Sequence, residues 1–131
     1  MDVVRVIMEH RNAPWEVSGA NAANLLGLSE QVPAQLVIQT TAQVPPVALG
    51  KSQITFKRVA PSSLVGAGTE AGLVLQAIRH LGPNGIGSAQ VERLRRTLKP
   101  HTKRELRKFA SKLPEWMRPV VNGIVQPPKS Q

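Results

Sequence analysis

The sequence predicts an α+β fold, in which a small, mostly antiparallel sheet of about three strands is packed by helices and the C-terminal third is helical. Three observations lead to this prediction. A continuous apolar run at 36–38 and an alternating segment at 53–59 have the patterns of strands. Apolar residues between 69 and 81 recur at helical spacing. Two later segments combine a narrow apolar stripe with many basic residues, which is typical of surface helices.

The N-terminal part of the chain predicts two short helices. Residues 3–10 carry apolar side chains at helical spacing, and Pro14 ends that helix because proline disfavours helical backbone in the residue before it. A short extended piece follows. Ser18 is in position to cap a helix over 19–26, and Gly27 suits the left-handed backbone that often follows a helix end.

The middle of the chain predicts the sheet. Pro33 begins a strand that contains the apolar run at 36–38. At the first residue of a strand, the missing N–H of proline does least harm. A hairpin follows, with strands at 47–49 and 53–59 joined by a turn at 50–51. The apolar residues of the second hairpin strand alternate with polar ones, so we expect one buried face and one wet face.

Three helices are then predicted. Thr69 can cap the first, and the sequence GPNG at 82–85 ends it through glycine and proline. Ser88 is the expected cap of the second. Thr102 and Glu105 have the spacing of a capping box at the start of the third.

One domain over residues 1–126 accounts for these elements. Residues 114–125 predict a last short helix or turn, anchored by Trp116 and Val120. The remaining residues, 127–131, are expected to form a disordered tail.

Composition excludes several classes of protein. The chain has 131 residues and no cysteine, so it has no disulfide framework and no thiolate metal site. No window approaches the roughly 20 apolar residues that cross a bilayer, and the N-terminus lacks the pattern of a signal peptide. We therefore expect a cytoplasmic protein without membrane contact.

The polar residues do not predict an enzyme. His10, His80 and His101 are far apart in sequence and have no paired metal spacing. No two carboxylates form a close pair with apolar neighbours, as general acid/base catalysis would favour. The glycine-containing stretch GPNGIG lacks the lysine and hydroxyl residue of a phosphate loop. We expect no catalytic residue, no metal and no cofactor.

The strongest chemical signal is positive charge in the C-terminal helices. The chain has a net charge of +9, and the segment 88–118, with ten basic residues and three acidic ones, carries +7 of it. Such a concentration predicts a polyanionic partner. The candidate nucleic-acid-binding residues are Arg93, Arg95, Arg96, Lys99, Lys103, Arg104, Arg107, Lys108 and Lys112.

The same pattern predicts contact with phosphates rather than with bases. Like charges three or four residues apart on a helix repel each other, and bound phosphates would offset this repulsion and release counterions. The chain has no tyrosine and few other aromatic residues, so stacking on bases is poorly provided for. A solvated surface or an acidic protein partner would explain the same charges.

Four segments give a resemblance to a known family. In chain order they are SGANAANLLGLSEQVPAQLVIQT, ITFKRVAP, AGLVLQAIRHLGPNGI and LPEWMRP. Together they resemble the AbiEi-type antitoxin family and its DUF6088 relatives, from about Val3 to Pro119. The first two segments are the most specific.

The resemblance implies an antitoxin and transcriptional regulator of a type IV toxin–antitoxin (abortive infection) system linked to phage resistance. Such a protein counters a nucleotidyltransferase toxin and binds operator DNA through an N-terminal winged helix-turn-helix. This chain is similar to the C-terminal, antitoxicity-linked domain alone, so we expect any DNA contact to be made by its basic surface. The partners implied are DNA and a cognate nucleotidyltransferase toxin. A stand-alone nucleic-acid-binding accessory protein and a basic protein-interaction module with an acidic partner are the alternative hypotheses.

Overall fold

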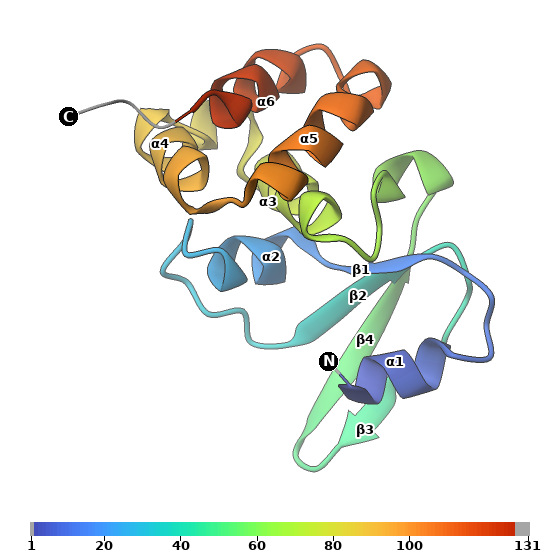
Figure 1. Cartoon of the computed structure of the whole chain (residues 1–131). Helices are drawn as coiled ribbons and strands as arrows, with labels where there is room; N and C mark the ends of the chain where they lie inside the picture. The colour runs from blue at the N-terminus through green and yellow to red at the C-terminus, as the bar shows by residue number, and fades with distance from the viewer. Residues whose placement is uncertain (1, 128–131) are drawn as a thin grey trace.

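The computed structural model describes residues 2–127, and it confirms the predicted α+β class and the helical C-terminal third (Figure 1). In this part of the chain the elements are α1 (Asp2–Met8), β1 (Trp15–Val17), α2 (Gly19–Leu25), β2 (Leu36–Thr40), β3 (Val47–Leu49), β4 (Ser52–Arg58), the 3-10 helix η1 (Pro61–Leu64), α3 (Glu70–Gly85), α4 (Ser88–Thr97), α5 (Pro100–Phe109), the 3-10 helix η2 (Ala110–Lys112) and α6 (Met117–Val125). Most of the predicted tail, residues 128–131, lies outside the described residues.

The sheet has four strands in the order β1-β2-β4-β3 rather than about three. The additional strand is β1, which was predicted only as an extended piece and which pairs antiparallel with β2. β3 and β4 form the predicted antiparallel hairpin, but β4 lies parallel to β2. A three-residue edge strand is too short to show a period of two, and pairing between distant segments leaves no local pattern.

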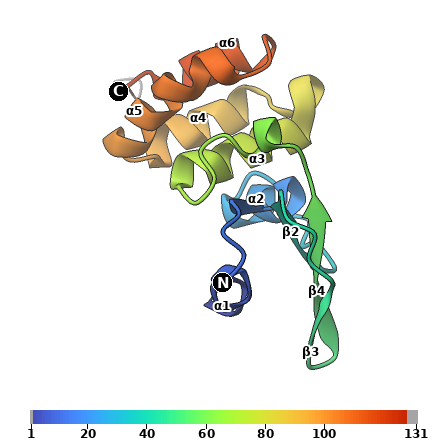
Figure 2. The same ribbon diagram turned by 90° about the vertical axis from the view of Figure 1, so that its right-hand side faces the viewer.

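The helix α1 covers one face of the sheet. Val4 and Met8 of α1 pack against Val17, Ile38 and Ile54 of three strands, and all five side chains are buried. Figure 2 shows α1 on one side of the strands. Val3, one of the apolar residues in the predicted helix at 3–10, is instead 43 % exposed.

The larger apolar core lies among the helices. α3 packs against α2 on one side and against α5 and α6 on the other. The fully buried large side chains of this core include Leu75, Ile78, Leu94, Leu106, Met117, Val121 and Ile124. The predicted anchors of the last helix, Trp116 and Val120, do pack against this core, although both are only half-buried and the fully buried stripe of α6 begins at Met117.

Local signals placed several helix ends correctly. The Oγ1 atom of Thr69 caps α3 by accepting a hydrogen bond from the backbone N–H of Gly72 at 3.1 Å. Gly27 and Gly50 take the left-handed backbone expected after a helix and in a hairpin turn. At Gly82, with φ of 75°, the regular part of α3 breaks as predicted, although one further turn follows it to Gly85.

Other predicted boundaries were wrong. β2 begins at Leu36 and not at Pro33. The N-cap of α4 is Gly87, whose N–H donates to Oε1 of Gln90 at 2.9 Å, and Ser88 is the first helical residue. Ser18 does occupy the N-cap position of α2, but its hydroxyl donates to the Asn21 side chain instead of capping backbone N–H groups.

The predicted capping box of α5 does not form. The helix already begins at Pro100, so Thr102 lies inside it and its hydroxyl donates to Oε1 of Glu70 at 2.6 Å. Glu105 pairs instead with His101, one turn earlier, at 2.9 Å. Proline at the first helical position is favourable, and this moved the start of α5 two residues ahead of the expected cap.

A buried carboxylate joins the sheet to the start of α3. Glu16 of β1 is 7 % exposed, and its two oxygens accept the N–H groups of Val17 and Gly68, each at 3.0 Å. Burial raises the pKa of Glu16 above its ordinary value of 4.5, and the two hydrogen bonds only partly oppose that effect. The charged form of Glu16 is therefore less favourable in the folded protein than in water.

Glu16 is expected to make stability depend on pH. Because its pKa is raised by folding, its contribution to the free energy of unfolding is fully present below about pH 4.5 and falls as pH rises through the folded-state pKa. The free-energy difference between the wild type and Glu16→Gln, measured by urea unfolding from acidic to neutral pH, should therefore shift against the wild type as pH rises. A difference that shifts in the opposite direction would mean that the hydrogen bonds outweigh burial.

Candidate nucleic-acid interface

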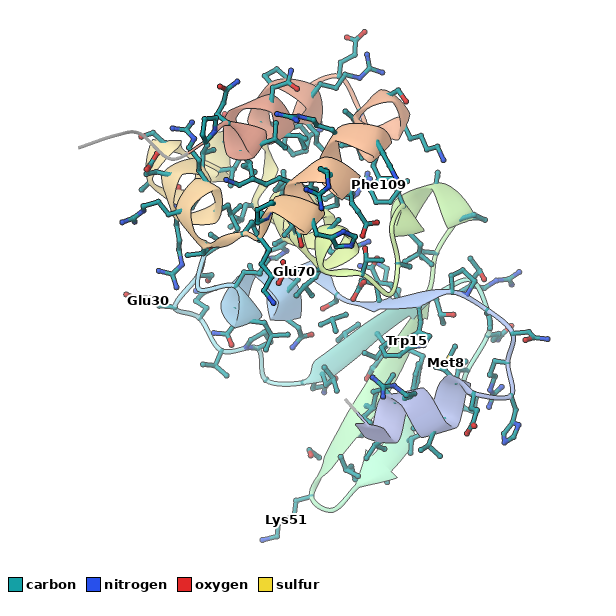
Figure 3. All side chains as sticks on the ribbon, in the orientation of Figure 1. Met8, Trp15, Glu30, Lys51, Glu70 and Phe109 are labelled. Carbon is teal, nitrogen blue, oxygen red and sulfur yellow. The ribbon has the colours of Figure 1, made fainter. Side chains whose placement is uncertain are left out.

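The nine predicted nucleic-acid-binding residues lie on α4, α5, η2 and the link between α4 and α5. Figure 3 shows many nitrogen-tipped side chains around these helices. The structure divides the nine residues into two that are half-buried, Arg95 and Lys103, and seven that are exposed.

Arg95 and Lys103 hold helices together. The Arg95 Nε atom donates to the carbonyl oxygen of Gly123 in α6 at 2.8 Å, and its guanidinium also pairs with Glu92 at 2.9 Å. Lys103 Nζ donates to the carbonyl oxygen of Arg95 at 2.6 Å and to that of Gln126 at 3.3 Å. Both cations therefore meet carbonyl groups near helix C-termini, where positive charge is favoured, and neither is freely available to a ligand.

α5 and η2 present the clearest row of available cations. Arg104, Arg107, Lys108 and Lys112 are exposed and recur three or four residues apart, whereas Leu106 between them is fully buried. They therefore lie on the outward face of α5 and continue onto η2. Within residues 2–127, none of these four cations forms an ion pair.

The remaining exposed cations lie on α4 and just after it, and two of them contact other protein groups. Arg93 Nε donates to the carbonyl oxygen of Leu26 at 3.2 Å, at the C-terminal end of α2. Arg96 lies 3.9 Å from Glu92. Lys99 occupies the N-cap position of α5 and is exposed. The term basic helical surface is used below for the exposed set Arg93, Arg96, Lys99, Arg104, Arg107, Lys108 and Lys112.

Sequence spacing could have identified one of the internal contacts but not the others. Glu92 lies three residues before Arg95 and four before Arg96, which is the spacing of helical ion pairs. The contacts of Arg95 with Gly123 and of Lys103 with Gln126 span 28 and 23 residues and leave no local signal. Arg118, which was not among the nine, is exposed and lies beside η2, where it donates to the carbonyl oxygen of Ser111 at 3.5 Å.

A metal centre and a membrane span find no support in the described residues. Residues 2–127 contain no group of three or more histidine, cysteine, aspartate or glutamate side chains that could hold a metal ion. Across the same residues, no helix is both long enough and apolar enough to cross a membrane.

Comparison with known proteins gives one match. The model of a family of unknown function, DUF6088, matches residues 2–106. The match covers the sheet, the helices α1 to α4 and most of α5, and it ends before η2 and α6. No curated protein and no solved structure matches the chain.

Proposed function

Since the chain belongs to the DUF6088 family of unknown function, we propose its role from its own residues: the basic helical surface binds the phosphate backbone of nucleic acid. In the cell, this binding serves an antitoxin-like regulatory protein of a type IV toxin–antitoxin system. The two parts of the proposal rest on different observations and have separate tests.

The observation that supports nucleic-acid binding is the row of four unpaired cations on α5 and η2. Four positive charges spaced by three or four residues repel each other by a few tenths of a kcal/mol per pair. No carboxylate in the described residues forms an ion pair with any of these four cations. A polyanion would relieve it and would gain the entropy of released counterions.

The side chains favour contact with phosphates over recognition of bases. Lysine and arginine supply most phosphate contacts, and they carry no sequence information when they bind the backbone. The aromatic residues nearest to the surface, Phe109 and Trp116, are half-buried in the helical core. They are therefore poorly placed to stack on bases, and we propose binding with little sequence specificity.

Binding is expected to weaken steeply with salt. Counterion release contributes a slope of about −0.9 per phosphate contact on duplex DNA, so four contacts predict a slope of about −3.6 in a plot of log affinity against log salt. Fluorescence anisotropy of a labelled duplex between about 50 and 200 mM KCl measures that slope. A flat response would remove phosphate contact from the proposal.

An acidic protein partner is tested in the same experiment. Polyglutamate is added as a competitor at the same concentration of negative charge as an unlabelled duplex. Stronger competition by polyglutamate than by the duplex would favour a basic protein-interaction module and would count against nucleic acid.

The antitoxin role is supported by the four segments that resemble AbiEi-type antitoxins. They map to the α2–β2 region, to β4 and the residues after it, to α3, and to the start of α6. The test is co-expression with the product of the neighbouring gene, which this proposal expects to be a nucleotidyltransferase, with growth as the readout. Rescue of growth is expected, and growth arrest despite expression of folded protein would contradict this part alone.

A further inference from the structure

A second cationic cluster lies on the opposite side of α3 from the α5 contact, next to the sheet. Gly19, Gln39, Gln76, Arg79 and His80 line a cavity of about 130 Å³ between the start of α2, the strand β2 and the helix α3. The volume equals about four water molecules at roughly 30 Å³ each, which is room for one small oxyanion.

Arg79, one of the residues that line the cavity, carries a buried donor without a partner. Within the described residues, the Nε atom of Arg79 is shielded from solvent and makes no hydrogen bond. An unpaired donor on a charged group is costly to bury, so a native fold usually supplies a partner for it. An acceptor bound in the cavity would supply one.

The neighbouring sheet face adds a second cation. Gln39 of β2 and Lys57 of β4 are register partners in the parallel pair, so their side chains project from the same face. The flanking residues Ile38 and Phe56 belong to the opposite face, which α1 covers. Figure 2 shows no described helix on the other side of β4, and Lys57 is exposed there.

A larger hollow of about 380 Å³ adjoins the cavity, because His80 lines both. Its other lining residues are Ala20, Ser29, Gln31, Val32 and Pro33. No carboxylate lines either space, so Arg79 is the one formally charged residue among their lining residues, and Lys57 on the adjacent strand β4 is the register partner of Gln39.

Gly19 shapes one wall of the cavity by close backbone approach. A Cβ atom at position 19 would fall on the His80 Cβ atom and lie 2.7 Å from the carbonyl oxygen of Gln76. α2 therefore lies directly against α3 at this point. Arg79 and His80 of α3 line the same cavity as Gln39 of β2.

We propose that this cavity binds an oxyanion of the phosphate class. Arg79 supplies the central donor, Gln39 an amide donor, and Lys57 and His80 line the approach from solvent. The site shares no residue with the basic helical surface. The phosphate group has two possible sources, a free phosphate or nucleotide and the terminal phosphate of a nucleic acid strand.

The probe for the site is inorganic phosphate, titrated into the whole protein at constant ionic strength and followed by ³¹P NMR line broadening. Arg79→Gln is expected to weaken phosphate binding by about tenfold, because a charge-assisted hydrogen bond is lost. Lys57→Gln should weaken it by a smaller factor. Lys51→Gln, an exposed cation at the tip of the same hairpin (Figure 3), should leave it unchanged.

The outcomes distinguish the two sources of the phosphate. They also distinguish binding in this cavity from duplex binding by the basic helical surface. Competition by a 5′-phosphorylated dinucleotide, but not by the same dinucleotide without that phosphate, would assign the site to nucleic acid ends. Competition by neither would assign it to free phosphate. Duplex binding through the basic helical surface should be unaffected by Arg79→Gln.

The inference is overturned if the wild type shows no binding up to about 10 mM phosphate. It is also overturned if Lys51→Gln loses as much binding as Lys57→Gln. Circular dichroism reports whether Arg79→Gln folds, and the exposed pair Lys57→Gln and His80→Gln tests the site independently of the half-buried Arg79.

Discussion

Replacing Arg104, Arg107 and Lys108 together with glutamine is expected to lower duplex DNA affinity by about 10²–10³-fold at 0.1 M salt. Each phosphate contact contributes about 0.9 to the exponent with which affinity depends on salt concentration. At 0.1 M salt, the loss of one contact therefore lowers the affinity roughly eightfold, and the loss of three lowers it about 500-fold. The slope of log affinity against log salt should become shallower by about 3. Anisotropy titrations of the variant and the wild type over the same salt range measure both quantities.

The fold should tolerate this triple replacement. All three side chains are exposed, none makes a hydrogen bond or ion pair within the described residues, and glutamine keeps a helix propensity close to that of lysine and arginine. Relief of like-charge repulsion should, if anything, raise the free energy of unfolding slightly. An unchanged far-UV circular dichroism spectrum and urea midpoint would attribute the lost binding to the missing charges.

Two control variants show whether location or total charge matters. The triple replacement of Arg11, Lys51 and Arg58 with glutamine removes the same charge from exposed positions outside α4 and α5, and should weaken binding far less. Lys103→Met removes one charge from within α5, where two carbonyl groups hold it, so stability should fall by about 1.5–3 kcal/mol with little change in salt slope. Equal losses in both triple variants would reduce the interface to a general effect of net charge.

Gly72→Ala is expected to destabilise the protein by about 3 kcal/mol. A Cβ atom on Gly72 would collide with the carbonyl oxygen of Gly66 and lie 2.6 Å from its carbonyl carbon. Both are backbone atoms, so no flexible side chain can move aside. Relief of the collision requires the loop before α3 to shift, and overpacking of this kind costs about 1–3 kcal/mol before any lost cap is counted.

The loop cannot shift without losing other contacts. The Gly66 carbonyl accepts hydrogen bonds from the Thr69 hydroxyl at 2.6 Å and from the Thr69 backbone N–H at 3.1 Å. Thr69 in turn caps α3 through the N–H of Gly72, and loss of such a cap costs about 1 kcal/mol. The expected destabilisation is the sum of these two effects.

Gly85→Ala is the matched control in the same helix. A Cβ atom there would lie no closer than 3.4 Å to Leu81, which is ordinary contact, and alanine should be neutral or slightly stabilising. Urea unfolding of the two variants measures the contrast. A Gly72→Ala variant within about 1 kcal/mol of the wild type would mean that the Gly66–Thr69 loop is easily displaced.

The candidate interface was predictable as a segment but not residue by residue. The count of cations between 88 and 118 and their spacing on α5 are local properties, and they identify Arg104, Arg107 and Lys108 without coordinates. The same properties also selected Arg95 and Lys103, whose partners are carbonyl groups of Gly123 and Gln126 at the far end of α6. Backbone carbonyls look alike in every sequence, so nothing in the chain marks them as partners.

The amino-acid sequence alone determined the α+β class, the β3–β4 hairpin, the Thr69 cap and the apolar stripe of α3, because each depends on residues within one or two turns of one another. Only the tertiary structure decided that β4 lies parallel to β2, that β1 joins the sheet, and that Gln39 and Arg79 line one cavity beside α2. These arrangements bring together segments that are distant in sequence. Their energy comes from burial and pairing across the whole chain, which no local pattern records.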